Sequence, residues 1–264
     1  LNFKEELYEK GVSFFDPNIK LFDNNEVFEE FEKRIIKNYD DSKLKSVSKY
    51  LKQLKNSSEK VRHFFACIAW LYNYPIYDKK NSTKTFEIKK YLGEYYHEDL
   101  ENIAFKYSGI ASYGLLSQYI YYDINFIYFF TKQYITSKNN PHDIINNLDL
   151  YTLMKKISNE DFKNMQKLSS RHMLNYLFNP DIYEPIVDTS CKENIVKHYL
   201  NKVNKNTLDE DILSIRKNQI GFDVSLFDIC KKSGISKTVH ILELEFEEKK
   251  DDFIVSLSSK NYKD

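Results

Sequence analysis

The most informative stretch of the chain is residues 171–199, which read RHMLNYLFNPDIYEPIVDTSCKENIVKHY. Apolar residues recur at helical spacing before Pro180, which predicts a buried helix that ends near this proline. Pro180 and Pro185 bound a short corner that carries an aromatic side chain, Tyr183, and a carboxylate, Glu184. A second helix follows the corner. The order of these parts predicts two helices that meet at an elbow.

Helical spacing continues on both sides of this elbow. Residues 61–72, VRHFFACIAWLY, are almost wholly apolar and predict a central helix that begins after two serines and ends before Pro75. Residues 78–85 are polar and predict a loop. Helices are expected downstream at residues 144–157, 161–178, 190–203 and 208–219, the last two introduced by capping-box patterns at Ser190 and Thr207. The chain holds only 6 Gly and 5 Pro, so we predict a mainly α fold of about ten helices.

The sequence pattern changes near the C-terminus. Residues 238–246, TVHILELEF, alternate apolar and charged side chains, and residues 253–257 do so more briefly. A period of two is typical of strands, so these two runs predict a short C-terminal β-hairpin. We therefore expect a helical domain over residues 1–225, followed at 226–264 by a short β element or the start of a following domain.

Charge and cysteine content narrow the functional classes. The chain has 39 Lys and Arg against 39 Asp and Glu, which argues against capture of DNA over the whole surface but leaves room for a local basic face. Its three cysteines, at positions 67, 191 and 230, form no C-x-x-C pair, so they indicate neither a zinc ribbon nor a disulfide framework. We expect a cytoplasmic protein, since the first residues also lack the apolar core of a signal peptide.

One apolar stretch, residues 110–130, approaches the length of a membrane span. It contains the polar residues Gln118, Asp123 and Asn125. An aspartate at the centre of a bilayer costs about 3 kcal/mol on insertion scales. The stretch therefore predicts a helix buried in protein, and we expect no membrane partner.

The segment from residue 43 to residue 62, which precedes and begins the central helix, is rich in lysine. The basic side chains are Lys43, Lys45, Lys49, Lys52, Lys55, Lys60 and Arg62. A face of this kind is the best candidate in the chain for contacts with DNA phosphates. The plainer interpretation is a solvated helix face, which is the commoner role of a run of charges.

Several short motifs, in the same order, resemble the region upstream of the motor in McrB-like AAA+ restriction proteins. They are GVSFF at 11–15, YLKQL at 50–54, ACIAWL at 66–71, Gly109-Ile110 with Gly114, LFNP at 177–180, YEPI at 183–186, Lys192 with Ile195-Val196, and DILSIR at 211–216. Their shared order, more than any one motif, carries the resemblance.

The resemblance implies a non-catalytic module of a modification-dependent DNA restriction or defence protein, acting in DNA targeting or subunit assembly. Its expected partners are DNA and the AAA+ motor and nuclease subunits of such a system. A phosphate-binding loop needs the pattern G-x-x-x-x-G-K-[ST], but the nearest string ends at Gly114 and is followed by Leu115. We expect no catalytic residue, metal or cofactor in this chain.

The residues of the elbow form a second candidate site, a partner contact built from Arg171, His172, Tyr183, Glu184 and Lys192. Tyr183 and Glu184 suit contact with a partner subunit or the positioning of a nucleotide. On the plainer interpretation, Tyr183 fills the space between two helices and Glu184 pairs with Arg171 or Lys192. His172 has no carboxylate or cysteine at metal-ligand spacing, so it is interpreted as a hydrogen-bonded structural residue.

Two other functions stay open. One is a protein-interaction scaffold without DNA contact. The other is a metal-dependent nuclease of the PD-(D/E)xK type, in which carboxylates hold Mg²⁺ and a lysine helps to activate water. The nuclease interpretation depends on the string Glu247-Glu248-Lys249, which falls in the expected turn beyond the strand at 238–246.

Overall fold

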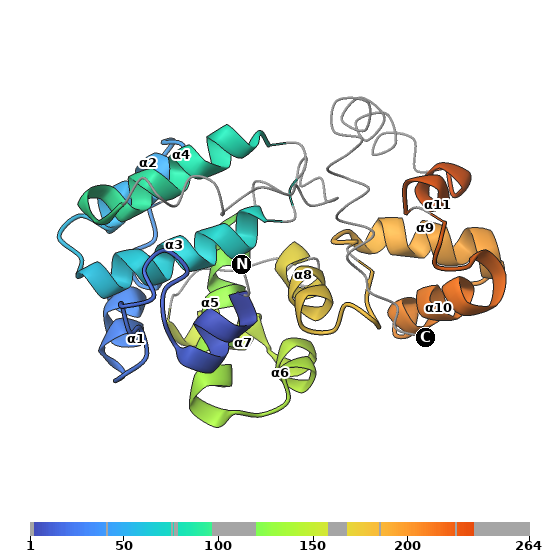
Figure 1. The fold of residues 1–264 in the computed structure, drawn as a ribbon, viewed down its shortest axis with the longest axis horizontal. Coiled ribbons are helices and arrows are strands. Elements are labelled where there is room, and N and C mark those ends of the chain that lie inside the picture. The colour runs from blue at the N-terminus through green and yellow to red at the C-terminus, as the bar shows by residue number, and fades with distance from the viewer. Residues whose placement is uncertain are drawn as a thin grey trace. The chain divides into compact units, whose positions relative to one another are not determined.

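The computed structural model describes residues 3–40, 42–74, 76, 79–96, 120–157, 168–184, 186–224 and 226–234. These parts of the chain are mainly helical (Figure 1). The chain divides into two compact units. The first comprises Leu1–Tyr74, Lys79–Lys106 and Leu115–Arg171, and the second comprises Pro75–Asp78, Tyr107–Gly114 and His172–Asp264.

The described helices of the first unit are α1 (Glu26–Phe31), α2 (Ser46–Gln53), α3 (Glu59–Asn73), α4 (Asn81–Leu92), α5 (Ile120–Ser137), α6 (Pro141–Asn147) and α7 (Leu150–Ile157). Two π-helical segments, Lys4–Lys10 and Glu32–Ile36, and a 3-10 turn, Gly93–Tyr95, belong to the same unit. Helix α8 (Ser169–Phe178) crosses the boundary between the units. The second unit contains α9 (Thr189–Leu200), α10 (Leu208–Ile215), the π-helical segment Arg216–Ile220, and α11 (Leu226–Lys232).

Helix α3 is the core of the first unit, as its sequence predicts. Ser58 begins the helix, because its hydroxyl accepts a hydrogen bond from the backbone N–H of Val61 at 3.4 Å. Twelve of the 15 side chains of α3 are buried. A helix that is apolar on nearly every side has to pack on several neighbours, and α1, α4 and α5 all contact it.

Aromatic rings fill the space between these helices. Phe31 of α1 stacks on Tyr128 of α5 with ring centroids 4.6 Å apart, and Phe64 of α3 lies 5.2 Å from Phe31. The hydroxyl of Tyr128 donates to the carboxylate of Glu32 at 2.9 Å. Tyr128 therefore buries its ring among apolar neighbours while its hydroxyl keeps a hydrogen-bond partner.

A carboxylate lies inside the first unit. Asp123 on α5 is 1% exposed and accepts hydrogen bonds from the backbone N–H of Ser170 at 2.9 Å and from its hydroxyl at 2.6 Å. Burial is the main cause that raises the pKa of Asp123 to about 6, and the bonds from Ser170 oppose this rise. From Ile120 onward, the stretch considered as a membrane span is a helix buried in protein, as expected.

The buried Asp123 predicts that wild-type protein loses stability relative to Asp123→Asn as the pH rises from about 4 to 7. The pKa of Asp123 is higher in the folded state than the ordinary value of 3.8, so folding is favoured below that value and the advantage disappears as the pH passes 6. Two pKa units correspond to about 3 kcal/mol. Urea unfolding at several pH values, followed by the fluorescence of the single tryptophan, Trp70, measures the difference. Parallel pH profiles for the two proteins would contradict the prediction.

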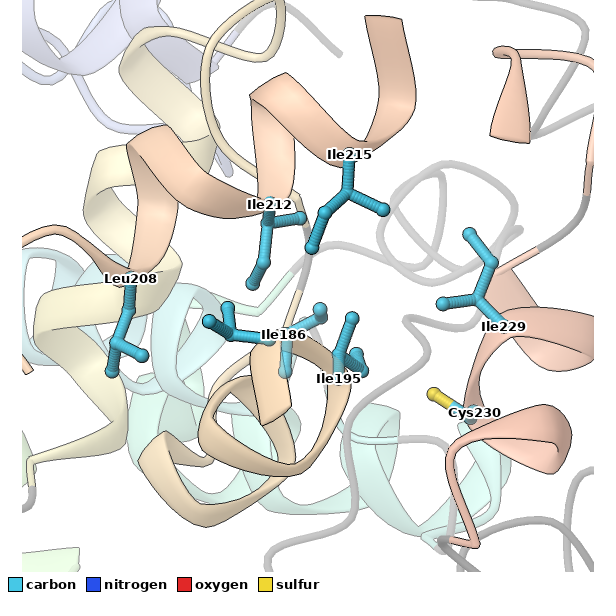
Figure 2. Packing of buried hydrophobic residues seen from close by; sticks show 8 residues of the cluster. Ile186, Ile195, Leu208, Ile212, Ile215, Ile229 and Cys230 are labelled. Atoms are coloured by element: carbon cyan, nitrogen blue, oxygen red, sulfur yellow. The ribbon is translucent and has the colours of Figure 1, made fainter. Parts of the chain in front are cut away.

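The second unit has its own apolar core. Figure 2 shows Ile212 and Ile215 of α10 pointing toward Ile186 and Ile195, with Ile229 of α11 on another side. The full cluster is Ile186, Ile195, Val196, Leu208, Ile212, Ile215, Ile229 and Cys230. Asp188 begins α9, because its carboxylate accepts hydrogen bonds from the backbone N–H groups of Ser190 and Cys191.

Each unit buries one cysteine thiol. Cys67 on α3 is 0% exposed and Cys230 on α11 is 5% exposed. Burial raises the pKa of each thiol to about 12. Cys191 is partly exposed, and none of these three described cysteines forms a disulfide bond.

Some helix boundaries differ from those expected. Residues 78–85 were expected to form a loop, but α4 already begins at Asn81, and the side chain of Lys84 is buried on it. Residues 144–157 were expected to form one helix but are divided between α6 and α7. The division arises because Asp149 starts a new helix, accepting hydrogen bonds from the backbone N–H and hydroxyl of Thr152.

The expected β element is not part of the described structure. Residues 238–246 and 253–257, which predict a hairpin, lie outside the described residues. Within those that are described, no extended strand is present: Val12 and Lys20 form an isolated antiparallel bridge, and Ile76 is also a bridge residue. The expected domain boundary at residue 225 falls inside the second unit, where α11 contacts α9.

Candidate nucleic-acid interface

Helix α2 holds Lys49 and Lys52 of the basic segment, with Lys43 and Lys45 just before it and Lys55 just after it. The helix is anchored to the core of the first unit. Its inner face includes Tyr50 and Gln53, which are 4% and 5% exposed. The ring of Tyr50 lies 4.8 Å from that of Phe65 on α3. The side-chain amide of Gln53 donates to the carbonyl of Ile35 at 3.1 Å. With these residues turned inward, the lysines of α2 lie on its outer face.

Four of the predicted lysines lie within or beside α2, and we refer to them together as the α2 lysine surface: Lys43, Lys45, Lys49 and Lys55. Lys43, Lys45 and Lys55 are exposed, and Lys49 is partly buried. Lys45 and Lys49 are four residues apart and so share one side of the helix. None of the four forms an ion pair with a carboxylate in the described part of the chain.

Positive charge is concentrated around this surface. Residues 33–58 contain eight lysines and arginines but only two acidic residues, Asp40 and Asp41, in a chain whose formal net charge is zero. Such an imbalance produces a local positive potential that attracts anions. The zero net charge of the whole chain therefore hides a basic region.

The N-terminus of α2 adds to this potential. Lys45 precedes the first helical residue and makes no side-chain hydrogen bond to the helix, and the first turn holds no acidic residue. The free N–H groups and the helix dipole place partial positive charge at this end. A lysine there is unfavourable in the free protein, whereas an anion such as a phosphate is stabilised.

Lys52 and Lys60 already have acidic partners. Lys52 lies 3.1 Å from the carboxylate of Asp40, and Lys60 lies 2.7 Å from that of Asp23. The pKa of Asp40 is lowered to about 2, chiefly by hydrogen bonds from Ser42 and further by Lys52. The pair between Lys60 and Asp23 is exposed on both sides and therefore weak, so Lys60 can turn to another anion. Lys52 is exposed, but the side chain of Asp40 is only 8% exposed, so this pair is held more firmly.

Arg62 has a structural role. Its guanidinium donates to the carbonyl of Tyr91 at 3.0 Å and to that of Leu54 at 3.1 Å. These carbonyls lie at the C-terminal ends of α4 and α2, where backbone acceptors lack partners within the helix. Arg62 therefore ties both helices to α3 and is not available on the α2 lysine surface.

The five candidate residues of the elbow do not form one site, because they belong to different units. Arg171 lies in the first unit, where its guanidinium donates to the carbonyls of Ile145, Asn146 and Leu148 at the end of α6. It also lies 4.9 Å from the ring centroid of Phe126. Arg171 thus caps one helix and covers an aromatic ring.

The other elbow residues belong to the second unit. Tyr183 is 6% exposed, which fits the interpretation that it fills space between helices. Glu184 forms a buried ion pair with Arg216, its carboxylate 2.9 Å from the guanidinium, in place of the expected pairing with Arg171 or Lys192. The guanidinium of Arg216 also donates to the carbonyls of Gly221 and Val224.

Lys192 is fully buried in a polar network. Its ammonium lies 2.5 Å from the carboxylate of Asp209 and 3.0 Å from Nδ1 of His172. The other ring nitrogen of His172 lies 3.0 Å from the hydroxyl of Thr189. Burial lowers the pKa of Lys192, while Asp209 opposes this shift. The network agrees with the structural role expected for His172.

Two groups of residues were missed by the sequence patterns. Arg216 and Asp209 satisfy the buried charges of the elbow, yet they are 32 and 17 residues away from their partners. Tyr39 and Leu44 lie beside the lysines and are 40% and 52% exposed. In the sequence, the only signal for Tyr39 and Leu44 is a large aromatic or apolar residue within a basic run; their exposure is visible only in the structure.

Other candidate sites are less well placed. Glu247 and Lys249, which suggest a nuclease, lie outside the described residues. Among the residues that the structure describes, no group of three His, Cys, Asp or Glu side chains is arranged to hold a metal ion. In the same residues, no helix has both the length and the apolar character that a membrane span requires.

Comparison of the chain with protein-family models, curated proteins and solved structures found no match.

Proposed function

We propose that this chain is a non-catalytic DNA-binding module whose α2 lysine surface contacts the phosphate backbone. The observation that supports this function best is the set of four lysines on a segment rich in positive charge, for which the described residues provide no acidic partner. Lysines that neutralise phosphates release the counterions condensed on DNA, and this release drives association. In a chain with zero net charge, counterion release favours DNA binding only where positive charges are segregated, as they are around α2.

The N-terminus of α2 supports the same proposal. It combines free backbone donors with Lys43 and Lys45, so one phosphate placed there receives both hydrogen bonds and charge. Anchoring by Gln53 and Arg62 holds α2 in place before any ligand arrives. A surface that is already ordered loses little conformational entropy on binding.

The proposed biological setting is DNA targeting in an McrB-like restriction system in the cytoplasm. This part of the proposal is supported by the order of the short motifs along the chain, from residues 11–15 to 211–216. In that setting, an AAA+ motor subunit and a nuclease subunit are the expected protein partners. The chain supplies contact with DNA, and its partners supply nucleotide hydrolysis and cleavage.

The triple variant Lys43→Glu/Lys45→Glu/Lys49→Glu is expected to weaken DNA binding about 100-fold at low salt, because three phosphate contacts are replaced by repulsion. Fluorescence anisotropy with a labelled 20-base-pair duplex measures the affinity. The slope of log K against log salt concentration should become less steep by roughly 3, at about 0.9 for each lost contact.

A second triple variant controls for net charge. Lys197, Lys202 and Lys217 are exposed in the second unit, and changing them to Glu alters the formal charge by the same amount. This variant should keep most of its affinity. Equal losses in the two triple variants would contradict the proposed surface. A wild-type chain that binds no DNA yet forms a stable complex with a motor or nuclease subunit would favour the scaffold.

A further inference from the structure

Tyr39 has a partly exposed ring that packs against a buried tyrosine. Its centroid lies 4.4 Å from that of Tyr121, at an interplanar angle of 50°. Tyr121 is itself 7% exposed, and its hydroxyl donates to the carbonyl of Ile36 at 2.9 Å. Tyr39 nevertheless keeps 40% of its surface exposed. The ring is therefore held in position by a buried neighbour while part of it stays accessible.

One lysine of the α2 lysine surface lies over this ring, and two others follow it closely in the sequence. The ammonium of Lys49 lies 5.9 Å from the ring centroid of Tyr39. Lys43 and Lys45 follow within six residues, and the exposed Leu44 lies between them. The result is an accessible aromatic and apolar area bordered by cations.

This combination distinguishes between two forms of nucleic acid. In a duplex, base faces are stacked on one another, and a protein ring at the surface reaches mainly phosphate and sugar. In a single strand, base faces are accessible, and proteins bind them by stacking aromatic side chains beside a basic groove. The lysines of the α2 lysine surface can contact the phosphates of either form, but the ring of Tyr39 can stack only on the accessible bases of a single strand.

We infer that the α2 lysine surface binds single-stranded nucleic acid in preference to duplex, with Tyr39 stacking on a base while the lysines contact the adjacent phosphates. This inference rests on the proposed function and specifies its ligand. Every base has a face on which a ring can stack, so the preference is for strandedness and not for sequence.

The test compares labelled dT20, rU20 and a 20-base-pair duplex by fluorescence anisotropy, using the whole chain. We expect dT20 to bind at least tenfold more tightly than the duplex. Tyr39→Leu should weaken dT20 binding about tenfold and change duplex binding less than twofold, because stacking on one base contributes about this much. Tyr39→Phe keeps the ring and should keep the affinity. The rU20 arm shows whether the sugar matters.

Tyr151 provides a matched control. It is also 40% exposed, and Lys155 lies 5.6 Å from its ring centroid, but it belongs to α7. Tyr151→Leu should leave dT20 binding unchanged. Duplex affinity equal to that of dT20, or equal losses for Tyr39→Leu and Tyr151→Leu, would overturn the inference.

Failure of this inference is separable from failure of the proposed function. If the lysine triple variant loses DNA binding while Tyr39→Leu binds dT20 as the wild type does, the stacking role is wrong and the basic surface stands. If the lysine triple variant binds as the wild type does, the proposed surface is wrong, and the inference falls with it.

Discussion

Replacing Glu184 with alanine is expected to lower the free energy of unfolding by about 3–5 kcal/mol. The change leaves the guanidinium of Arg216 with its carbonyl partners but without a carboxylate, in a site where its side chain is 6% exposed. A buried charge without a counter-charge retains its desolvation cost and loses its compensation. The loss is therefore far larger than for an ion pair at the surface.

Urea unfolding followed by circular dichroism measures the loss at Glu184. The double variant Glu184→Leu/Arg216→Met removes both charges while keeping similar volume, and it should recover most of the stability. Glu193→Ala breaks the exposed pair with Lys205 in the same unit and should change the stability by less than about 1 kcal/mol. Similar losses for Glu184→Ala and Glu193→Ala would show that the buried pair has no special weight.

The Lys192→Ala variant should also lose about 3–5 kcal/mol, for two reasons. The side chain of Lys192 is 0% exposed, so its removal leaves a cavity beneath α9. It also removes the cation that faces Asp209 and donates toward His172. Both the cavity and the uncompensated carboxylate destabilise the folded chain.

A graded series separates these two causes at Lys192. Lys192→Met fills much of the cavity and should lose less stability than Lys192→Ala. Adding Asp209→Asn to Lys192→Met removes the unpaired charge and should recover part of the remaining loss. Lys197→Ala, an exposed lysine on the same helix, is the control and should stay within about 0.5 kcal/mol of wild type. Equal losses for Lys192→Ala and Lys197→Ala would contradict the buried network.

Local signals predicted helices well where one residue type dominated. The run of apolar residues at 61–72 predicted the central position of α3, because such a helix has no polar side to expose. Ser58 was a reliable start, since its hydroxyl and the backbone donor it satisfies lie three residues apart. Both features depend on neighbours in sequence and need no knowledge of the tertiary fold.

Competing signals explain the errors. A capping box was expected at Ser190, but Asp188 comes two residues earlier, and its carboxylate accepts the first N–H groups of α9. Thr207 does precede α10, yet its hydroxyl donates to Asp211 instead of accepting from the helix backbone. When several polar residues can cap a helix, the tertiary position of the chain decides which one does so.

The candidate interface was predictable as a group of charges but not as a surface. The run of basic residues identified the lysines, whereas the partners of Lys60 and Arg62 include residues 37 and 29 positions away. Pairings at such distances depend on how the helices pack, which a local pattern does not contain. The exposure of Tyr39 was missed for the same reason, because an aromatic residue in sequence looks equally suited to the core.

The two buried thiols have a consequence for following how the protein opens. The thiolate is the nucleophile that attacks an alkylating reagent, and burial disfavours this form at Cys67 and at Cys230. Each cysteine sits in the interior of a different unit, and Cys191 is partly exposed. Alkylation of Cys67 therefore records opening events of one half of the chain, and alkylation of Cys230 records those of the other. The alkylation rates of Cys67 and Cys230 thus report the opening of the two units separately.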